Sequence, residues 1–190
     1  SIISSATYDH SSGTLVVTGE NLVAQSGTDN DIDVSKLTFS GEDNYTYTLT
    51  SNDVELTSSS EFSITLNAAD QLQLAGLLNK NGTSSGGGNT YNIAATEDWA
   101  PGADVSSNIA DLNGNTITVS NVAAPTLTSA TYNASNGALV ITGTNLPAYS
   151  GATNDIDISK LTLSGEGSNT YTLTSDDVEL TSSTEFSLNL

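Results

Sequence analysis

Two pairs of carboxylates stand at a spacing that suits metal binding. The string N-D-I-D at residues 30–33 returns unchanged at residues 154–157. In an extended segment, residues i and i+2 face the same side roughly 7 Å apart, so unpaired carboxylates there repel each other. A hard cation with several oxygen ligands removes that repulsion, and this chemistry suits calcium. The predicted Ca²⁺ ligands are Asp31 and Asp33 in the first string, and Asp155 and Asp157 in the second.

Asp29 adds a third acid to the first string, but Thr153 stands at the matching place in the second. Asp29 is therefore a weaker candidate ligand than the four repeated residues. A structural interpretation stays open beside the metal site. The loop is then simply solvated, or Asp33 caps a turn at Val34–Lys36 with its side chain.

A second acidic group precedes residue 112. Its members are Glu97, Asp98, Asp104 and Asp111. A calcium loop of the EF-hand type starting at Asp111 would need Gly at its sixth position and Glu at its twelfth, where the chain has Thr116 and Val122. We reject that loop and predict a hairpin turn at Asn113-Gly114 instead. Asp104 and Asp111 remain candidates to supply oxygens to a metal site at the end of a domain.

No residue pattern indicates an enzyme. His10 is the only histidine, and Ala134 occupies the matching position in the second half of the chain. Its neighbours Asp9 and Ser11 would point in different directions from a strand end, and nothing resembles a nucleophile elbow. We therefore predict that His10 lies in a surface turn and that the chain has no catalytic residues.

Trp99, the only tryptophan, is predicted to be an anchor in the core or at the rim of the domain. The alternative is an exposed platform that stacks on a sugar ring. An exposed Trp99 beside acidic residues would favour a carbohydrate-binding module, and a buried one would remove the main residue of that hypothesis.

The chain repeats itself without a gap. The segment from Ala6 to Leu66 aligns with the segment from Ala130 to Leu190 at a constant offset, and roughly two thirds of the positions are identical. The sequence thus predicts one complete domain at residues 1–123 and the N-terminal half of a second copy at residues 124–190. Tandem copies of a whole domain favour reach or multivalency over catalysis.

Composition narrows the class of partner. The chain has 190 residues with 22 Asp and Glu against 3 Lys, for a formal charge of −19, and it contains no Cys and no Met. Such an acidic surface repels phosphate backbones and anionic lipids, so neither nucleic-acid binding nor membrane insertion is expected. The absence of Cys excludes disulfides and thiolate zinc sites.

Short runs that alternate apolar and polar residues predict strands with one buried face. The runs are Thr14–Thr18, Tyr45–Thr50, Val54–Thr57, Glu61–Leu66, Thr90–Ala94 and Asn115–Ser120. Their number and the turn residues between them predict an all-β, Ig-like Greek-key β-sandwich. One segment, Asn67–Asn79, predicts a short helix instead, with Asn67 as its N-cap, Asp70 in its first turn and a stop at Asn81-Gly82.

The strings SATYNASNGALVITGTNL, NDIDISKLTLSGEG and TYTLTSDDVELTSSTEFSLNL, with ADLNGNTITVSNV, resemble the Ig-like tandem repeats of very large bacterial surface adhesins, secreted proteins of the repeats-in-toxin type. The resemblance implies an extracellular extender region that holds a distal binding domain away from the cell and is stiffened by calcium. The nonapeptide calcium repeat of those toxins, G-G-x-G-x-D, is absent. S-layer proteins also use such repeats.

The predicted function is therefore a structural stalk repeat of a bacterial cell-surface adhesin, with neighbouring repeats as partners. The alternatives are a carbohydrate- or protein-binding module and a subunit of an S-layer or fibre. We expect the chain to be a piece of a longer protein and its second copy to associate homotypically. Three completions of the second copy are open: further residues beyond Leu190, strands from another molecule, or residues 67–124 of this chain.

Overall fold

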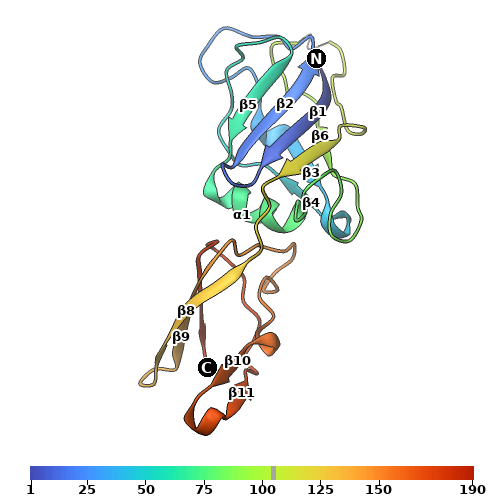
Figure 1. Cartoon of the computed structure of the whole chain (residues 1–190). Helices are drawn as coiled ribbons and strands as arrows, with labels where there is room; N and C mark the ends of the chain where they lie inside the picture. Colours follow the sequence, from blue (N-terminus) through green and yellow to red (C-terminus); the bar gives the residue numbers. More distant parts are fainter. Residues whose placement is uncertain (104–105) are drawn as a thin grey trace. The chain divides into compact units, whose positions relative to one another are not determined.

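The computed structural model describes residues 1–103 and 106–190, which form two compact units, Ser1–Ala123 and Ala124–Leu190 (Figure 1). Each unit is built mostly from short strands, so the predicted all-β character is confirmed. Within the described residues there is one α-helix, α1 (Ala68–Leu77), and it belongs to the first unit.

Two sheets form the first unit. The first sheet has the order β5-β2-β1-β7 and the second has the order β4-β3-β6. The strands are β1 (Ile2–Asp9), β2 (Thr14–Glu20), β3 (Leu37–Ser40), β4 (Thr46–Thr48), β5 (Glu61–Thr65), β6 (Asn92–Ala95) and β7 (Ile117–Ser120). Neighbouring strands are antiparallel, except that β7 runs parallel to β1.

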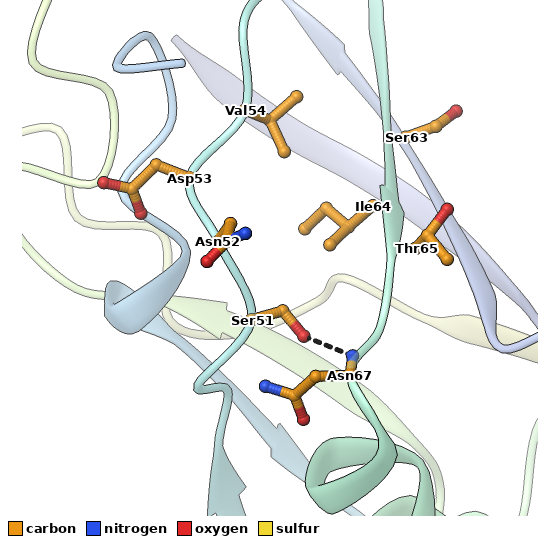
Figure 2. Close-up of a pocket in the computed structure, with 8 residues that line it drawn as sticks. All are labelled: Ser51, Asn52, Asp53, Val54, Ser63, Ile64, Thr65 and Asn67. Carbon is orange, nitrogen blue, oxygen red and sulfur yellow. Dashed lines mark hydrogen bonds between the residues drawn. The ribbon is translucent and has the colours of Figure 1, made fainter.

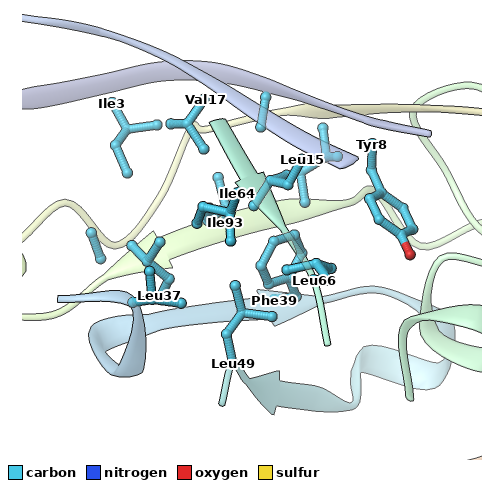
Figure 3. Close-up of a cluster of buried hydrophobic side chains, with 14 of the residues drawn as sticks. Ile3, Tyr8, Leu15, Val17, Leu37, Phe39, Leu49, Ile64, Leu66 and Ile93 are labelled. Atoms are coloured by element: carbon cyan, nitrogen blue, oxygen red, sulfur yellow. The ribbon is translucent and has the colours of Figure 1, made fainter. Parts of the chain in front are cut away.

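The core of the first unit lies between these sheets. Alternate residues of β2, β3, β5, β6 and β7 are buried, as a period of two dictates. Leu15 and Val17 of β2 are buried against Leu37 and Phe39 of β3, and Figure 3 shows the two sets of side chains facing each other. The alternation predicted for the run Thr14–Thr18 is thus the alternation of β2 in this core.

The helix forms where the spacing of its residues predicts it. Asn67 caps it by accepting a hydrogen bond from the main-chain N–H of Asp70 at 2.8 Å. It ends at Leu77, and the N–H of Leu78 donates to the carbonyl of Leu74 at 2.8 Å. The predicted stop at Asn81-Gly82 is therefore a few residues too late. In the chain, α1 follows β5 of the first sheet and precedes β6 of the second (Figure 1).

Two local predictions are wrong. The run Val54–Thr57 forms no strand, because only Val54 pairs, through a single bridge to Ile32. The turn at Asn113-Gly114 does not join two paired strands. The residues on either side of it pair with β6 instead of with each other, through bridges from Asp111 to Ala95 and from Thr116 to Asn92.

The second unit repeats the first half of the first unit. Its elements are β8 (Thr126–Asn133), β9 (Ala138–Thr144), β10 (Thr162–Ser164), β11 (Thr170–Thr172) and β12 (Glu185–Asn189). One sheet has the order β12-β9-β8, and β10 pairs with β11. Residues 67–123 do not complete this unit, because β6 and β7 pair with β3 and β1 of the first unit.

Candidate functional site

The Asp31 carboxylate is fully buried and joins two separate segments. Its Oδ1 accepts a hydrogen bond from the main-chain N–H of Gln25 at 2.6 Å, and its Oδ2 accepts one from Leu56 at 2.7 Å. By accepting two main-chain N–H groups, the carboxylate satisfies donors that burial would otherwise leave unpaired. Asp31 thus fastens the loop after β2 to the segment that precedes β5.

Asp33 has a different local task. Its Oδ1 accepts hydrogen bonds from the N–H of Ser35 at 3.1 Å and from the Ser35 hydroxyl at 2.6 Å. It thereby caps the 3-10 helix η1 (Val34–Lys36), so the structural alternative for Asp33 is confirmed. Asp53 supports the same turn by accepting the N–H of Val34 at 2.9 Å.

The second unit reproduces both arrangements. Asp155 accepts the N–H of Tyr149 at 2.5 Å and that of Leu180 at 2.7 Å. Asp157 caps the 3-10 helix η3 (Ile158–Lys160) through Ser159. Desolvation raises the pKa of the Asp155 carboxyl above its usual value, although its two main-chain donors act in the opposite direction.

Among the described residues, the other predicted ligands Asp29 and Asp111 form no metal-binding group with these pairs. Asp111 accepts the N–H of Ile3 at 2.9 Å through Oδ2 and the side-chain amide of Asn115 at 2.9 Å through Oδ1. Asp29 is exposed and has a positive φ of 50°, a conformation that Thr153 shares with a φ of 54°. Asp104 lies outside the described residues.

The described carboxylates do not fit a calcium shell as they are arranged. Calcium takes six to eight oxygens, whereas the oxygens of Asp31, Asp155 and Asp111 accept hydrogen bonds from N–H groups. Within residues 1–103 and 106–190, no group of three or more acidic or His side chains is placed to hold a metal ion. Calcium binding therefore remains a prediction from the sequence.

Among the described residues, Asp70 has the most extensive carboxylate network, although the sequence marks it only as an acid in a first helical turn. This fully buried side chain accepts from the Tyr47 hydroxyl at 2.8 Å. It also accepts from the N–H and hydroxyl groups of Thr50 and of Ser51. Desolvation and the contact with Asp70 raise the pKa of Tyr47 to about 12. The network binds the start of α1 to the segment after β4.

One signal in the sequence points toward this network. The string T-Y-T-L-T-S, which carries all three of its hydroxyl donors, is identical at residues 46–51 and 170–175. The repeated set of hydroxyl donors could have directed attention to an acceptor that they share.

The structure confirms the turn predicted at His10 but shows that its ring is partly buried. The imidazole is partly buried, its Nε2 lies 2.8 Å from the carbonyl oxygen of Leu78, and its ring meets Tyr8 edge to face. Burial lowers the pKa of His10 below its usual value, because desolvation penalises the charged ring. His10 therefore links the turn after β1 to the C-terminal end of α1.

Trp99 is fully buried, as the core interpretation predicts. Its indole N–H donates to the carbonyl of Ile109 at 2.8 Å, and its ring packs near Phe62 with centroids 6.4 Å apart. Glu97 accepts the N–H groups of Ile109 and Ala110 beside it. A side chain enclosed in this way cannot stack on a sugar.

The surface hollow drawn in Figure 2 lies between the segment Ser51–Val54 and β5. Across it, the main-chain N–H of Asn67 donates to the Ser51 hydroxyl at 2.9 Å. Its one carboxylate, Asp53, already accepts the N–H of Val34. The lining offers hydroxyl and amide groups but no base beside a nucleophile, so it has the chemistry of a polar surface depression.

Comparison with known proteins adds no relative: no family model, no curated protein and no solved structure matches this chain. Among the described residues, no helix has both the length and the apolar character needed to cross a bilayer.

Proposed function

We propose that this chain is a structural extender repeat from the stalk of an extracellular bacterial surface protein. The observation that supports it most directly is the gapless duplication, in which elements and carboxylate contacts recur together. Asp31 and Asp155 each bind two main-chain N–H groups 6 residues before and 25 residues after themselves. Both copies therefore keep the carboxylate contacts that join separate segments of the fold.

The finer fold proposed here is an Ig-like Greek-key sandwich. Two packed sheets with a core of alternating residues support it, as does the transfer of the chain between sheets through α1. Sandwiches of this kind stack end to end with short linkers, which suits a stalk.

The end of the first unit supports a stiff connection. The N–H of Val122 donates to the side-chain oxygen of Asn81 at 2.9 Å, and the Asn121 amide donates to Asp9 at 3.1 Å. Only Ala123 and Ala124 separate the anchored Val122 from Pro125, whose ring fixes its own φ. A stalk that holds a distal domain away from a cell benefits from such a joint.

The alternative of a carbohydrate-binding module loses its main residue, because Trp99 is buried. A protein-binding module and a fibre subunit remain alternatives. The fibre has one specific observation in its favour, the exposed apolar residues of the second unit, among them Tyr132 and Tyr171.

The extender function can be tested with arrays of residues 2–125 containing one, two and four copies, which keep Pro125 at each junction. Small-angle X-ray scattering should show a maximum dimension that grows in proportion to the copy number. An array whose maximum dimension grows only as the cube root of its mass would be a compact assembly and would contradict a stalk. Arrays with a Gly-Ser linker in place of residues 122–125 provide the flexible control.

A further inference from the structure

The second unit exposes a face that the first unit buries. Tyr8 of β1 is 1% exposed, whereas its counterpart Tyr132 of β8 is 56% exposed. Phe39 of β3 is fully buried, and its counterpart Leu163 of β10 is 38% exposed. Every residue of β8 is exposed, although β1 buries three of its eight side chains. The same sequence pattern therefore forms a core in one unit and a surface in the other.

In the first unit, strands β7 and β6 cover the edges that correspond to the open face of the second unit. Strand β7 pairs in parallel with β1 from Ala6 to Asp9, and β6 pairs antiparallel with β3 from Leu37 to Ser40. In the second unit β8 ends its sheet, and β10 pairs only with β11. The strand edges at residues 130–133 and 161–164 are thus open. The corresponding edges in the first unit are paired with β7 and β6.

The second unit also carries three hydroxyl side chains, here called the polar socket, that match the donors of the Asp70 network. In the first unit, Asp70 accepts hydrogen bonds from the hydroxyls of Tyr47, Thr50 and Ser51. The matching side chains of the second unit are Tyr171, Thr174 and Ser175. In the part of the chain that the structure describes, none of these three hydroxyls has a hydrogen-bond partner of this kind, and Tyr171 is 62% exposed. The socket lacks an acidic acceptor at a helix start.

We propose that this face of the second unit is a docking surface for a polypeptide segment of the kind formed by residues 67–123. Such a segment brings a helix with Asp in its first turn, followed by two strands that complete the two sheets. A second copy of the same face is a poorer occupant, because it would place two sets of hydroxyl donors together without a carboxylate. The proposal does not depend on the extender function.

The test adds an isolated 67–123 segment to the full 190-residue chain. Hydrogen exchange read by mass spectrometry should show protection at residues 130–133 and 161–164 that increases with segment concentration and saturates at one segment per chain. Residues 6–9 and 37–40 of the first unit serve as an internal reference, since their partners are already in place. Their exchange should not change.

Matched variants of the segment distinguish the proposed contact from nonspecific binding. Asp70→Asn should weaken binding about tenfold or more, because it removes a charged acceptor from three hydroxyl donors. Asp98→Asn makes the same change of charge at an exposed residue and should bind like the unchanged segment. Equal binding of both variants would overturn the assignment of the socket.

A segment that precipitates alone can be joined to Leu190 through a flexible linker, with the same exchange measurement. Absence of protection in both forms would overturn the proposal. So would a dimer of the unmodified chain in which residues 130–133 and 161–164 are already protected, since the occupant is then a second copy. Protection in either form that is lost with Asp70→Asn supports it.

Discussion

At the scale of single residues, several described acids of this chain act as acceptors for main-chain N–H groups. Asp31, Asp111 and Asp155 each bridge positions far apart in sequence, and Asp33 and Asp157 cap short helical turns. A chain without Cys and with only three Lys has few other means of fastening its loops. Buried carboxylates with two N–H partners fill that role.

This role makes Asp31→Asn destabilising even without metal. One main-chain N–H would face an amide N–H₂, so we expect a loss of about 2 kcal/mol in the free energy of unfolding of the first unit. Urea titration in the presence of a chelator measures it, and Trp99 fluorescence reports on the first unit alone because Trp99 is the only tryptophan.

Asp29→Asn is the control for that measurement, since Asp29 is exposed and Thr replaces it in the second copy. It should change the stability by less than about 0.5 kcal/mol. If Asp31→Asn has no effect in chelator but a large effect in calcium, the residue is a metal ligand and the hydrogen-bond account fails.

His10 should make the first unit sensitive to pH. Its pKa is lowered in the folded state by burial, so the folded protein binds this proton less readily than the unfolded chain does. The stabilising contribution is complete above the ordinary His pKa of about 6.5, and it is lost progressively as the pH falls from there toward the lowered value. His10→Gln should remove this part of the slope of stability against pH.

Unfolding by urea at several pH values between 5.5 and 7.5, followed by Trp99 fluorescence, checks the effect. Carboxylates titrate mostly below this window, so they contribute little to the difference between the variants. Identical slopes for the unchanged protein and for His10→Gln would show that His10 does not carry the effect.

At the scale of elements, α1 depends on its first turn. Asn67 accepts the N–H of Asp70, and its amide donates to the Thr50 hydroxyl at 3.1 Å. Asn67→Ala removes the cap, and we expect it to cost about 1 kcal/mol in the stability of the first unit. Asn67→Ser keeps a capping oxygen and should cost much less.

Thermal unfolding followed by Trp99 fluorescence measures both variants. The helix α1 also positions Asp70 and the carbonyl that His10 meets. Loss of the cap should therefore destabilise the whole unit and lower the melting temperature of a single unfolding transition. A variant in which far-UV helix signal disappears before the Trp99 transition would show that α1 unfolds separately from the sandwich.

At the scale of the whole molecule, the charge of −19 opposes compaction, so added salt should stabilise both units by screening. The described carboxylates are not gathered into a calcium shell. We therefore expect equal concentrations of calcium and magnesium chloride to raise the melting temperature equally. Calorimetric scans in each salt, with sodium chloride at the same ionic strength, measure this.

A gain specific to calcium would contradict that expectation and support the metal site predicted from the sequence. Binding to the folded state alone adds about 2.7 kcal/mol at a hundredfold excess over the dissociation constant, which is easily resolved. The double change Asp31→Ala and Asp33→Ala would then locate the site. If the calcium effect survives it, Asp104 and Asp111 are the next ligands to vary.

The sequence alone determined the duplication, the all-β character and the local elements that follow from period and caps. The helix after Asn67 and the strands at residues 14–20 and 61–65 are examples, because their signals lie within a few neighbouring residues. The cap formed by Asp33 was among the alternatives that its local residues allow. Strands β1 and β3 were not among the runs identified.

Only the tertiary structure decided which donors meet which acceptors. Asp31 reaches Leu56, Asp70 reaches Ser51 and His10 reaches Leu78, over separations of 25, 19 and 68 residues. A local pattern cannot specify such partners, because strand pairing between distant segments sets them. The same pairing gives one copy of the repeat a buried core and the other an exposed face, although their residues are nearly the same.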